Sequence, residues 1–360
     1  MDMIDKVNIG IEIAGVKLNS PLILSEGPLS GNAELIKRAA EHKLGAIVTK
    51  SIRNEPAASP SRYMIRVKKG LINADWTDMG FDRWMEELDT IDIDIPLIAN
   101  VATNHVKPEK AAEYAAILQH HGASIVTFSD YEPENLVDAV RMAREKVDVP
   151  IMVKLPPFCK NVGKLCRELE DAGVNCIAAM DAVGPAMDID IETGRPVLGN
   201  RDGYGYLSSS PIFPLTLAYI TEICRNVTVP VVGVGGVTDY QDVIKLIMAG
   251  ASGVGIVGGA ILHGLGLFDR IHNDLIKWMI ERGISDLSEI RGLAQKQEDS
   301  EVYGWIPGVD LMTCTGCGLC ATSCFKQAIS IVDKKAVIDH EICVGCGVCL
   351  TTCPCKSITI

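Results

Sequence analysis

Eight of the 13 cysteines repeat one spacing near the end of the chain. The first run is Cys314-x2-Cys317-x2-Cys320-x3-Cys324, and the second is Cys343-x2-Cys346-x2-Cys349-x3-Cys353 with Pro354 after it. Thiolates at such spacing either bind metal or form disulfides. The opening MDMIDKVNIG has neither the basic nor the apolar region of a secretion signal, so we expect the reducing cytoplasm and metal-bound thiolates.

The two runs resemble the ligand pattern of bacterial two-cluster ferredoxins, in which the fourth cysteine of each run binds the other cluster. The resemblance implies two 4Fe–4S clusters that transfer one electron at a time. It assigns Cys314, Cys317, Cys320 and Cys353 to the first cluster, and Cys343, Cys346, Cys349 and Cys324 to the second. Structural zinc is the alternative for four-cysteine runs, and the doubled x2 spacing argues against it.

The cysteine runs lie in a module that we place at residues 311–360, after a linker at 296–310. The linker, KQEDSEVYGWIPGVD, is polar and is then punctuated by glycine and proline. Within the module, AISIVDKKAVID and SITI predict short strands. The remaining cysteines have no ligand spacing, and we expect plain, at least partly buried side chains at Cys159, Cys166, Cys176, Cys224 and Cys355.

Residues 1–295 alternate short apolar runs with stretches of helical period, and the opening NIGIEIAGVKLNSP predicts a small hairpin. Each run is apolar on both faces, as in a buried parallel sheet. Eight strand–helix units predict a (β/α)8 barrel. A doubly wound open sheet is the alternative, and the lack of GxGxxG after the first strand argues against it. The predicted strands are 21–28, 46–52, 96–102, 124–129, 151–156, 176–183, 230–236 and 253–260, and the predicted helices are 31–43, 81–88, 108–121, 134–146, 161–172, 214–226, 239–249 and 267–282.

In such barrels the chemistry collects at the C-terminal ends of the strands. The last two predicted strands each reach a glycine pair, Gly235-Gly236 and Gly258-Gly259, which lets backbone N–H groups approach a phosphate. Packing is the alternative role for each pair. Lys50 and Lys154 stand in apolar strands, where an ammonium is costly unless it meets an anion or reaches solvent. A reduced flavin is one such anion.

The motifs SPLILSEGPLS, VTKS, IANVA, MVKL, VGVGGV and VGIVGGA together resemble the dihydroorotate dehydrogenase family, in particular its ferredoxin-fused dihydropyrimidine dehydrogenase type, over residues 7–293. The resemblance implies FMN in the barrel mouth and hydride exchange between FMN and a carbon–carbon bond. It further implies FMN contacts from Ser25, Glu26, Gly27, Lys50, Ser51, Asn100, Lys154, Gly235, Gly236, Gly258 and Gly259, with Ser208 and Ser209 near the ring.

Two departures from that family concern the substrate. The family has an Asn-x-Ser-Cys-Pro stretch after the fourth strand, whose asparagine clamps the pyrimidine and whose cysteine passes the proton; here Thr127 and Asp130 stand at those positions. After the sixth strand, Asp181-Ala182 replaces an Asn-Thr or Asn-Ser pair. We therefore expect a substrate other than a standard pyrimidine. The predicted substrate contacts are Asn73, Thr127 and Asp181.

Three residues are predicted to take part in catalysis: Asp130 as general acid or base, Tyr131 as a second proton donor, and Lys50 beside the reacting ring. The alternative role for Asp130 is to cap the helix that follows in SDYEPEN. The basic stretch from Arg53 to Gly70 is predicted to be a long loop over the barrel mouth, either simply solvated or holding an anionic substrate.

The net charge of −12 argues against a nucleic-acid partner, and no apolar stretch is long enough to span a membrane. The sequence thus predicts an iron–sulfur flavoprotein oxidoreductase for a small-molecule substrate, expected to form a homo-oligomer. Lacking a dinucleotide fingerprint, it would exchange electrons with ferredoxin or an NAD(P)H-oxidising flavoprotein subunit. The alternatives are an electron-transfer subunit with a catalytically altered barrel, and a flavin-free docking scaffold.

Overall fold

The computed structural model describes residues 7–74, 78–296 and 304–359 of the chain. Contacts divide the chain into two compact units, Met1–Gln297 and Glu298–Ile360, which we call the barrel unit and the cysteine unit. The boundaries predicted at residues 295 and 311 stay predictions. Of the predicted linker at 296–310, residues 297–303 lie outside the described part.

A closed barrel of eight parallel strands forms the centre of the barrel unit, in the order β10-β15-β16-β3-β4-β7-β8-β9. The predicted strands and the predicted barrel are confirmed, because each apolar run is buried on both its faces. The strands are β3 (Leu22–Leu24), β4 (Ala46–Val48), β7 (Leu97–Ala102), β8 (Ile125–Ser129), β9 (Ile151–Leu155), β10 (Cys176–Ala179), β15 (Val231–Val234) and β16 (Gly253–Ile256).

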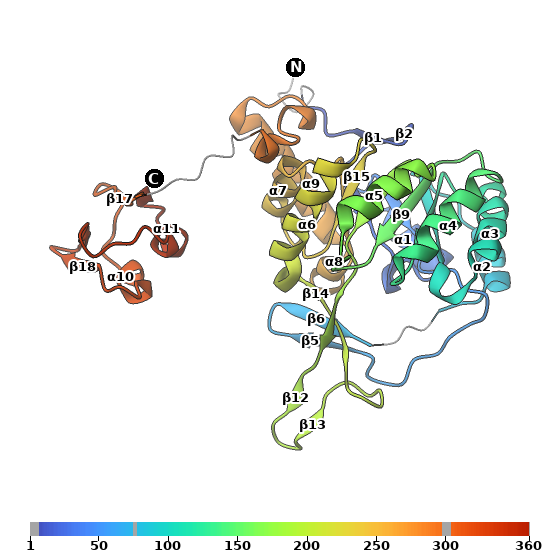
Figure 1. The fold of residues 1–360 in the computed structure, drawn as a ribbon, viewed down its shortest axis with the longest axis horizontal. Helices are drawn as coiled ribbons and strands as arrows, with labels where there is room; N and C mark the ends of the chain where they lie inside the picture. The colour runs from blue at the N-terminus through green and yellow to red at the C-terminus, as the bar shows by residue number, and fades with distance from the viewer. Residues whose placement is uncertain (1–6, 75–77, 297–303, 360) are drawn as a thin grey trace. The chain divides into compact units, whose positions relative to one another are not determined.

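The predicted hairpin closes one end of the barrel. Strands β1 (Ile11–Ile13) and β2 (Val16–Leu18) pair antiparallel. Their Ile13 and Leu18 belong to the same buried cluster as the inward-facing strand residues, such as Ile98. Figure 1 shows this hairpin at the opposite end of the barrel from β5 and β6.

An outer layer of helices covers the barrel, as the sequence predicted (Figure 1). These helices bury one face against the strands, for example Phe268 and Ile271 of α9. Short α8, which starts at the second glycine pair, was not predicted as a helix. The helices are α1 (Ala33–Ala40), α2 (Phe81–Leu88), α3 (Pro108–His120), α4 (Pro133–Arg144), α5 (Val162–Asp171), α6 (Phe213–Asn226), α7 (Tyr240–Met248), α8 (Gly258–His263) and α9 (Gly266–Arg282), with 3-10 turns at Pro28–Ser30, Thr103–His105, Ser210–Ile212, Leu287–Glu289 and Leu293–Gln295.

The predicted loop from Arg53 to Gly70 is wrong in its second half, which enters a four-stranded sheet of order β11-β14-β6-β5. Lys68 and Lys69 form the turn of a hairpin, and its second strand then pairs with a distant strand of the chain, Leu71 opposite Ser208. Pairing between strands so far apart in the chain has no signature in the local sequence of either strand. The strands are β5 (Met64–Val67), β6 (Gly70–Asn73), β11 (Val183–Ala186) and β14 (Gly205–Ser209).

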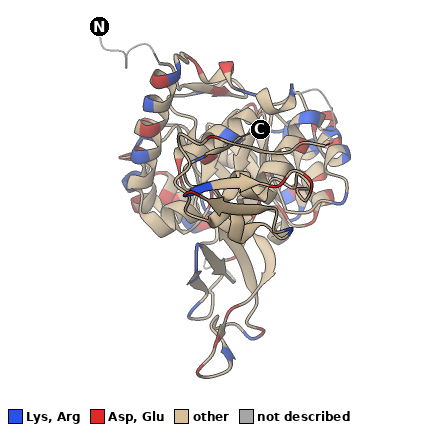
Figure 2. Ribbon diagram, turned by 90° about the vertical axis from the view of Figure 1, so that its left-hand side faces the viewer, with Lys and Arg blue, Asp and Glu red and all other residues tan. Residues whose placement is uncertain are grey.

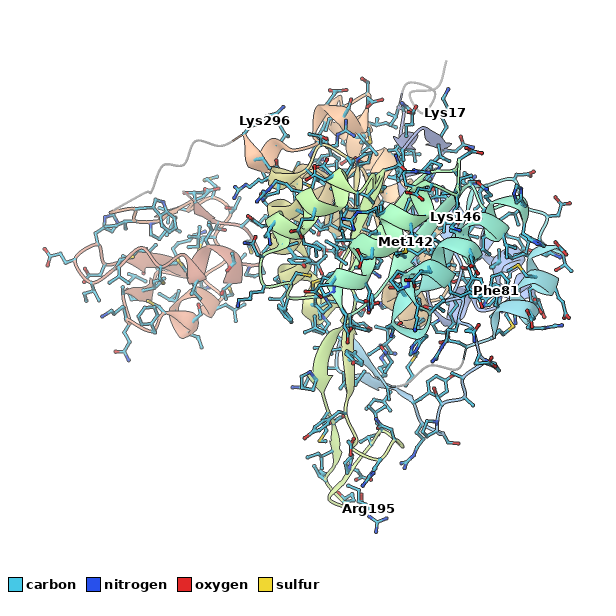
Figure 3. The ribbon with its side chains drawn as sticks, turned by 45° about the vertical axis from the view of Figure 1, so that its right-hand side comes forward. Lys17, Phe81, Met142, Lys146, Arg195 and Lys296 are labelled. Atoms are coloured by element: carbon cyan, nitrogen blue, oxygen red, sulfur yellow. The ribbon has the colours of Figure 1, made fainter. Side chains whose placement is uncertain are left out.

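Residues 183–209 form an arm that projects from the barrel mouth (Figure 1). Its tip carries the two-stranded ladder of β12 (Ile189–Asp190) and β13 (Arg195–Pro196), and Figure 3 shows Arg195 at the far end. Figure 2 shows acidic and basic residues interspersed along the outer helices and the arm. The arm also exposes large apolar side chains, Ile189, Ile191 and Tyr204.

The cysteine unit repeats one small motif. Each motif has a cysteine loop, a short helix and strands, and the two helices are α10 (Leu319–Ser323) and α11 (Val348–Thr352). The predicted strands are confirmed: β18 (Ile329–Val332) pairs with β19 (Lys335–Ile338), and β20 (Ile358–Thr359) pairs with β17 (Gly308–Val309). Strand β17 falls inside the predicted linker. Throughout the described part of the chain, the helices are too short or too polar to cross a membrane.

Replacing Phe268 with alanine tests the packing of helices on the barrel. Phe268 is fully buried in α9, so Phe268→Ala should lower the free energy of unfolding by about 3–5 kcal/mol. Urea denaturation followed by far-UV circular dichroism measures the change. The control is Phe158→Ala, whose ring is 61% exposed and should cost less than about 0.5 kcal/mol. Equal losses in both variants would contradict the packing described here.

Candidate functional site

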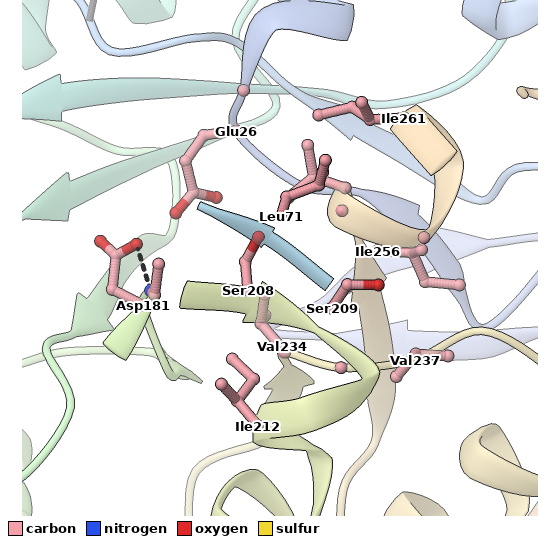
Figure 4. A pocket seen from close by; sticks show the side chains of 18 of the residues that line it. Glu26, Leu71, Asp181, Ser208, Ser209, Ile212, Val234, Val237, Ile256 and Ile261 are labelled. Atoms are coloured by element: carbon pink, nitrogen blue, oxygen red, sulfur yellow. Dashed lines mark hydrogen bonds between the residues drawn. The ribbon is translucent and has the colours of Figure 1, made fainter. Parts of the chain in front are cut away.

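A cavity opens at the C-terminal ends of the barrel strands, under the sheet that contains β6 and β14 (Figure 4). Its empty volume, including open solvent at its mouth, is about 660 Å³. Its lining includes eleven of the predicted contact residues: Glu26, Gly27, Asn73, Lys154, Asp181, Ser208, Ser209, Gly235, Gly236, Gly258 and Gly259.

The first glycine pair is held in backbone conformations that favour glycine. Gly235 and Gly236 have φ angles of +124° and +86°. A Cβ atom on Gly235 would meet Thr216 Oγ1 at 2.7 Å, and one on Gly236 would meet Phe213 Cα at 2.6 Å. The backbone therefore lines the cavity without side chains here, as a closely approaching phosphate requires.

Charged side chains cluster at another part of the lining. The Lys154 ammonium, 5% exposed, forms an ion pair with Glu26. Burial lowers the pKa of Lys154, but the carboxylates of Glu26 and Asp181 outweigh burial and raise this pKa above its usual value. Lys154 is therefore a cation in the cavity, and the sequence analysis did not foresee that its partner is another predicted contact residue.

Lys50 does not line the cavity; it belongs to a second buried ion group. Its Nζ lies 3.0 Å from Asp78 Oδ1, and Arg53 Nη1 lies 3.2 Å from Asp78 Oδ2. Asp78 has a side chain that is 3% exposed, and two cations share it. Sequence analysis missed Asp78, because its partners are distant in sequence and only the fold brings them together.

Several predicted contact residues hold buried polar atoms without a hydrogen-bond partner in the described part of the chain. In the cavity lining these are Asn73 Nδ2 and Ser209 Oγ. In adjacent barrel strands they are Asn100 Oδ1 and Thr127 Oγ1, in residues that pair in register. Asn100 Nδ2 donates to Ser51 Oγ at 3.2 Å. Unpartnered buried polar atoms are costly, so this set fits a bound group with polar edges, as FMN has.

Asp130 is 5% exposed and does not line the cavity. Its Oδ2 accepts hydrogen bonds from Thr103 Oγ1 at 2.6 Å and Asn135 Nδ2 at 3.1 Å, and its Oδ1 accepts one from the Glu132 backbone N–H at 2.9 Å. Asp130 is not the cap of α4, whose N-cap is Glu132 without a side-chain cap bond. Its bonds instead tie the loop before α4 to Thr103 and to the Asn135 side chain.

Tyr131 is 41% exposed and does not line the barrel cavity. Its ring stacks on Tyr206 with centroids 5.5 Å apart. Burial of the phenol, followed by the charge of Asp181, raises the pKa of Tyr131 above its usual value. The phenol therefore keeps its proton at neutral pH and can donate it.

The eight motif cysteines gather in two separate cavities of the cysteine unit. One is lined by Cys314, Cys317, Cys320 and Cys353, and the other by Cys343, Cys346, Cys349 and Cys324. The fourth cysteine of each run thus lies with the other run, as the crossed ligand sets require. Backbone N–H groups point at three of the sulfurs: Ala328 N lies 3.3 Å from Cys324 Sγ, Ser357 N lies 3.3 Å from Cys353 Sγ, and Ala336 N lies 3.5 Å from Cys314 Sγ.

No three His, Cys, Asp or Glu side chains within the described residues are placed to hold a single metal ion. The four thiolates of a 4Fe–4S cluster bind four separate irons, so they stand farther apart than the ligands of one ion. Glycine lets other chain segments cover each cysteine loop. A Cβ on Gly316 would meet Lys334 O at 2.2 Å, and one on Gly345 would meet Trp305 O at 2.1 Å.

The other five cysteines have the expected burial. Cys166 and Cys176 are buried, and Cys159, Cys224 and Cys355 are partly buried. Burial raises the pKa of Cys166 to about 12, so this thiol is unreactive at neutral pH. Cys355 lines the same cavity as the first predicted ligand set, a position that its lack of motif spacing did not suggest.

Comparisons with known proteins agree with both units. The family model described as dihydroorotate dehydrogenase matches residues 129–279, and the model of a 4Fe-4S dicluster domain matches residues 313–357. Two relatives are the catalytic subunits of dihydroorotate dehydrogenase B (NAD(+)) from Pyrococcus furiosus and Methanothermobacter thermautotrophicus. Both are 32% identical to this chain; they cover 81% and 78% of it, and it covers 100% and 97% of them.

A solved structure supports the fold of the barrel unit. The crystal structure of DHODH from Eimeria tenella in complex with ferulenol superposes with a TM-score of 0.69 at 15% identity, covering 81% of this chain and 89% of that one. The cofactors of the present chain are FMN and two 4Fe–4S clusters, and it is an oxidoreductase that acts on CH–CH groups. With 32% identity over the whole length of a relative, the chain belongs to the dihydroorotate dehydrogenase family and adds to it a C-terminal 4Fe–4S dicluster domain.

Proposed function

We propose that this protein exchanges a hydride between FMN and a carbon–carbon bond of a small substrate that is not a standard pyrimidine, and that it passes the electrons singly to or from a redox partner. The observation that carries the proposal is the combination, in one chain, of the barrel cavity with its glycine pairs and two four-cysteine cavities. FMN supplies two-electron chemistry and the clusters supply one-electron steps.

Different residues of the cavity would bind different parts of FMN and of the substrate. The glycine pairs would hold the phosphate, and Lys154 would face the part of the ring where negative charge develops. Glu26 keeps Lys154 in place through their ion pair. Asn73 and Ser209 offer unpartnered polar atoms to the bound molecules.

The substrate proposal rests on the residues that replace the family's asparagines. Thr127 and Asp181 cannot offer the paired donor and acceptor of a carboxamide, so an amide edge of a pyrimidine would leave groups unpaired there. The relatives named dihydroorotate dehydrogenase act on dihydroorotate by name, and this chain is proposed to differ at those positions.

Two side chains are candidates for moving the substrate proton. The three hydrogen bonds to Asp130 favour its structural role, whereas Tyr131, with its raised pKa, holds a proton beside Asp181. A raised pKa makes the phenol a weaker acid, and neither side chain lines the cavity, so both Asp130 and Tyr131 stay proposals for this role.

The proposed partner is a ferredoxin or an NAD(P)H-oxidising flavoprotein subunit, met in the cytoplasm. The exposed apolar side chains of the arm support a homo-oligomer. A relay subunit with an inactive barrel is the second candidate function, favoured by the loss of both asparagine positions.

Removing one cysteine from each set tests the cluster assignment. The wild-type protein, purified anaerobically, should contain about eight irons and one FMN per chain. Cys320→Ala and Cys349→Ala should each lose about four irons and keep FMN, because the barrel unit is unchanged. Each variant should also reoxidise its dithionite-reduced flavin with soluble ferredoxin at least tenfold more slowly. Cys166→Ala, a buried barrel cysteine, is the control and should keep all irons. Full iron content in Cys320→Ala would refute the assignment.

Anaerobic mixing with pyrimidines tests the substrate proposal. Dihydroorotate and dihydrouracil should leave the flavin absorbance of the wild-type protein unchanged, since Thr127 and Asp181 do not match their amides. Dithionite, which reduces any accessible flavin, is the positive control. Rapid bleaching by dihydroorotate would show that the protein is a conventional dihydroorotate dehydrogenase.

Asp130→Asn separates a structural from a catalytic role. The amide has only one acceptor oxygen, so it cannot accept all three bonds of the carboxylate, and the free energy of unfolding should fall by about 1–3 kcal/mol, with unchanged FMN content. Urea denaturation and flavin absorbance give these values. Asp138→Asn in α4, whose carboxylate pairs with exposed Arg141, should change stability by less than about 1 kcal/mol. Unchanged stability in Asp130→Asn would return Asp130 to the catalytic candidates.

A further inference from the structure

The charged lining of the barrel cavity has more negative than positive groups. It contains Glu26, Lys154 and Asp181, which are two carboxylates and one ammonium. The ammonium is already committed to Glu26 in an ion pair. One negative charge is therefore left over in the cavity wall, and an uncompensated charge in a partly buried site is costly.

The surplus charge lies on Asp181. Its Oδ1 accepts one hydrogen bond, at 2.9 Å, from the backbone N–H of its own neighbour, Ala182. Its Oδ2 has no hydrogen-bond donor among the described residues. Figure 4 shows the Asp181 and Glu26 carboxylates on the same side of the cavity, with Asp181 bonded only to its own loop. FMN adds no cation to offset this surplus, because its phosphate is negative.

The surroundings of Asp181 do not supply the missing donor. The charge of Asp181 contributes to the raised pKa of Lys154, but the Lys154 ammonium donates its hydrogen bond to Glu26. The charge of Asp181 also contributes to the raised pKa of Tyr131, but no hydrogen bond joins the two side chains in the described part of the chain. One oxygen of the partly exposed Asp181 side chain is thus free to accept hydrogen bonds from a ligand in the cavity.

The chemistry of a carboxylate specifies the matching edge. A carboxamide has one donor and one acceptor and suits an amide edge of a ring. A carboxylate has two acceptors, so an amide edge would place a carbonyl oxygen against it. An edge with two N–H donors, as in an amidinium, a guanidinium or the N3–H and 2-amino group of isocytosine, forms two bonds with the carboxylate that are strengthened by its charge.

We propose that Asp181 selects a substrate whose edge presents two N–H donors of the amidine or 2-amino heterocycle class. This inference rests on the proposed function, which supplies the flavin beside which the substrate binds. The unpartnered Asn73 Nδ2, in the same cavity lining, is a donor for an acceptor elsewhere on that substrate.

Binding of isosteric probes to the oxidised, FMN-loaded full-length protein tests the proposal. Isocytosine has an amino group where uracil has its 2-oxo group, and orotate adds a carboxylate to uracil. Titrations followed by the perturbation of the flavin absorbance need no turnover. Isocytosine should bind at least about tenfold more tightly than uracil, and orotate should bind weakest, because unpaired or repelling polar groups are penalised strongly.

Two variants identify the residue responsible. Asp181→Asn should reverse the order and bind uracil more tightly than isocytosine, with unchanged FMN content and circular dichroism. The control is Asp188→Asn in the arm, whose Oδ1 accepts a bond from the next backbone N–H at 3.0 Å as Asp181 does, and it should keep the wild-type order. Uracil or orotate binding as tightly as isocytosine to the wild type would overturn the proposal. So would an unchanged preference in Asp181→Asn, or no perturbation by millimolar isocytosine.

The two proposals fail in different ways. The binding experiment starts from protein that already contains FMN, so an unchanged preference in Asp181→Asn refutes the assignment of Asp181 alone. The cluster variants are measured without any pyrimidine. If they reoxidised the reduced flavin as fast as the wild type, the proposed function would be refuted and the assignment of Asp181 would be unaffected.

Discussion

The ammonium of Lys154 is the charge on which the barrel cavity depends. It stands in β9, a strand otherwise buried among apolar neighbours, and a lone ammonium there would be expelled or neutralised. Glu26, which follows β3, reaches it from far away in the sequence and fixes it as a cation. Closure of the barrel makes this possible, because it brings the ends of β3, β9 and β10 around one opening. The same closure brings the two glycine pairs into the lining of that opening.

The cysteine unit is held together by an exchange between its halves. Cys324 ends the first run but lies with the second set, and Cys353 does the reverse. Two clusters bound in this way would connect both halves covalently to each other through iron and sulfur. The small apolar core, with Ile329, Ile338 and Ile358, could hardly fix so short a unit without them.

Much of the fold was predictable because its strands and helices have recognisable patterns in the local sequence. Eight runs apolar on both faces indicated a covered parallel sheet, and their number indicated a barrel. The sheet over the cavity was not predictable, because β6 and β14 pair across a long sequence separation and have no distinctive alternation. For the site, the cavity contains eleven predicted contact residues, but Asp78 and the Glu26–Lys154 pair appear only in three dimensions. The sequence shows which residues can carry charge, whereas the fold determines which charged side chains form ion pairs.

That distinction is clearest for the two aspartates that depart from the family pattern. In the sequence, Asp130 and Asp181 are equivalent, since each stands where the family has another functional residue. In the structure, Asp130 accepts three hydrogen bonds from Thr103, Glu132 and Asn135, and so has little capacity left for a ligand. Asp181 accepts one bond and lines the cavity beside a lysine that is already paired. The number of donors that the protein supplies thus separates a carboxylate that stabilises the fold from one that is left for the substrate.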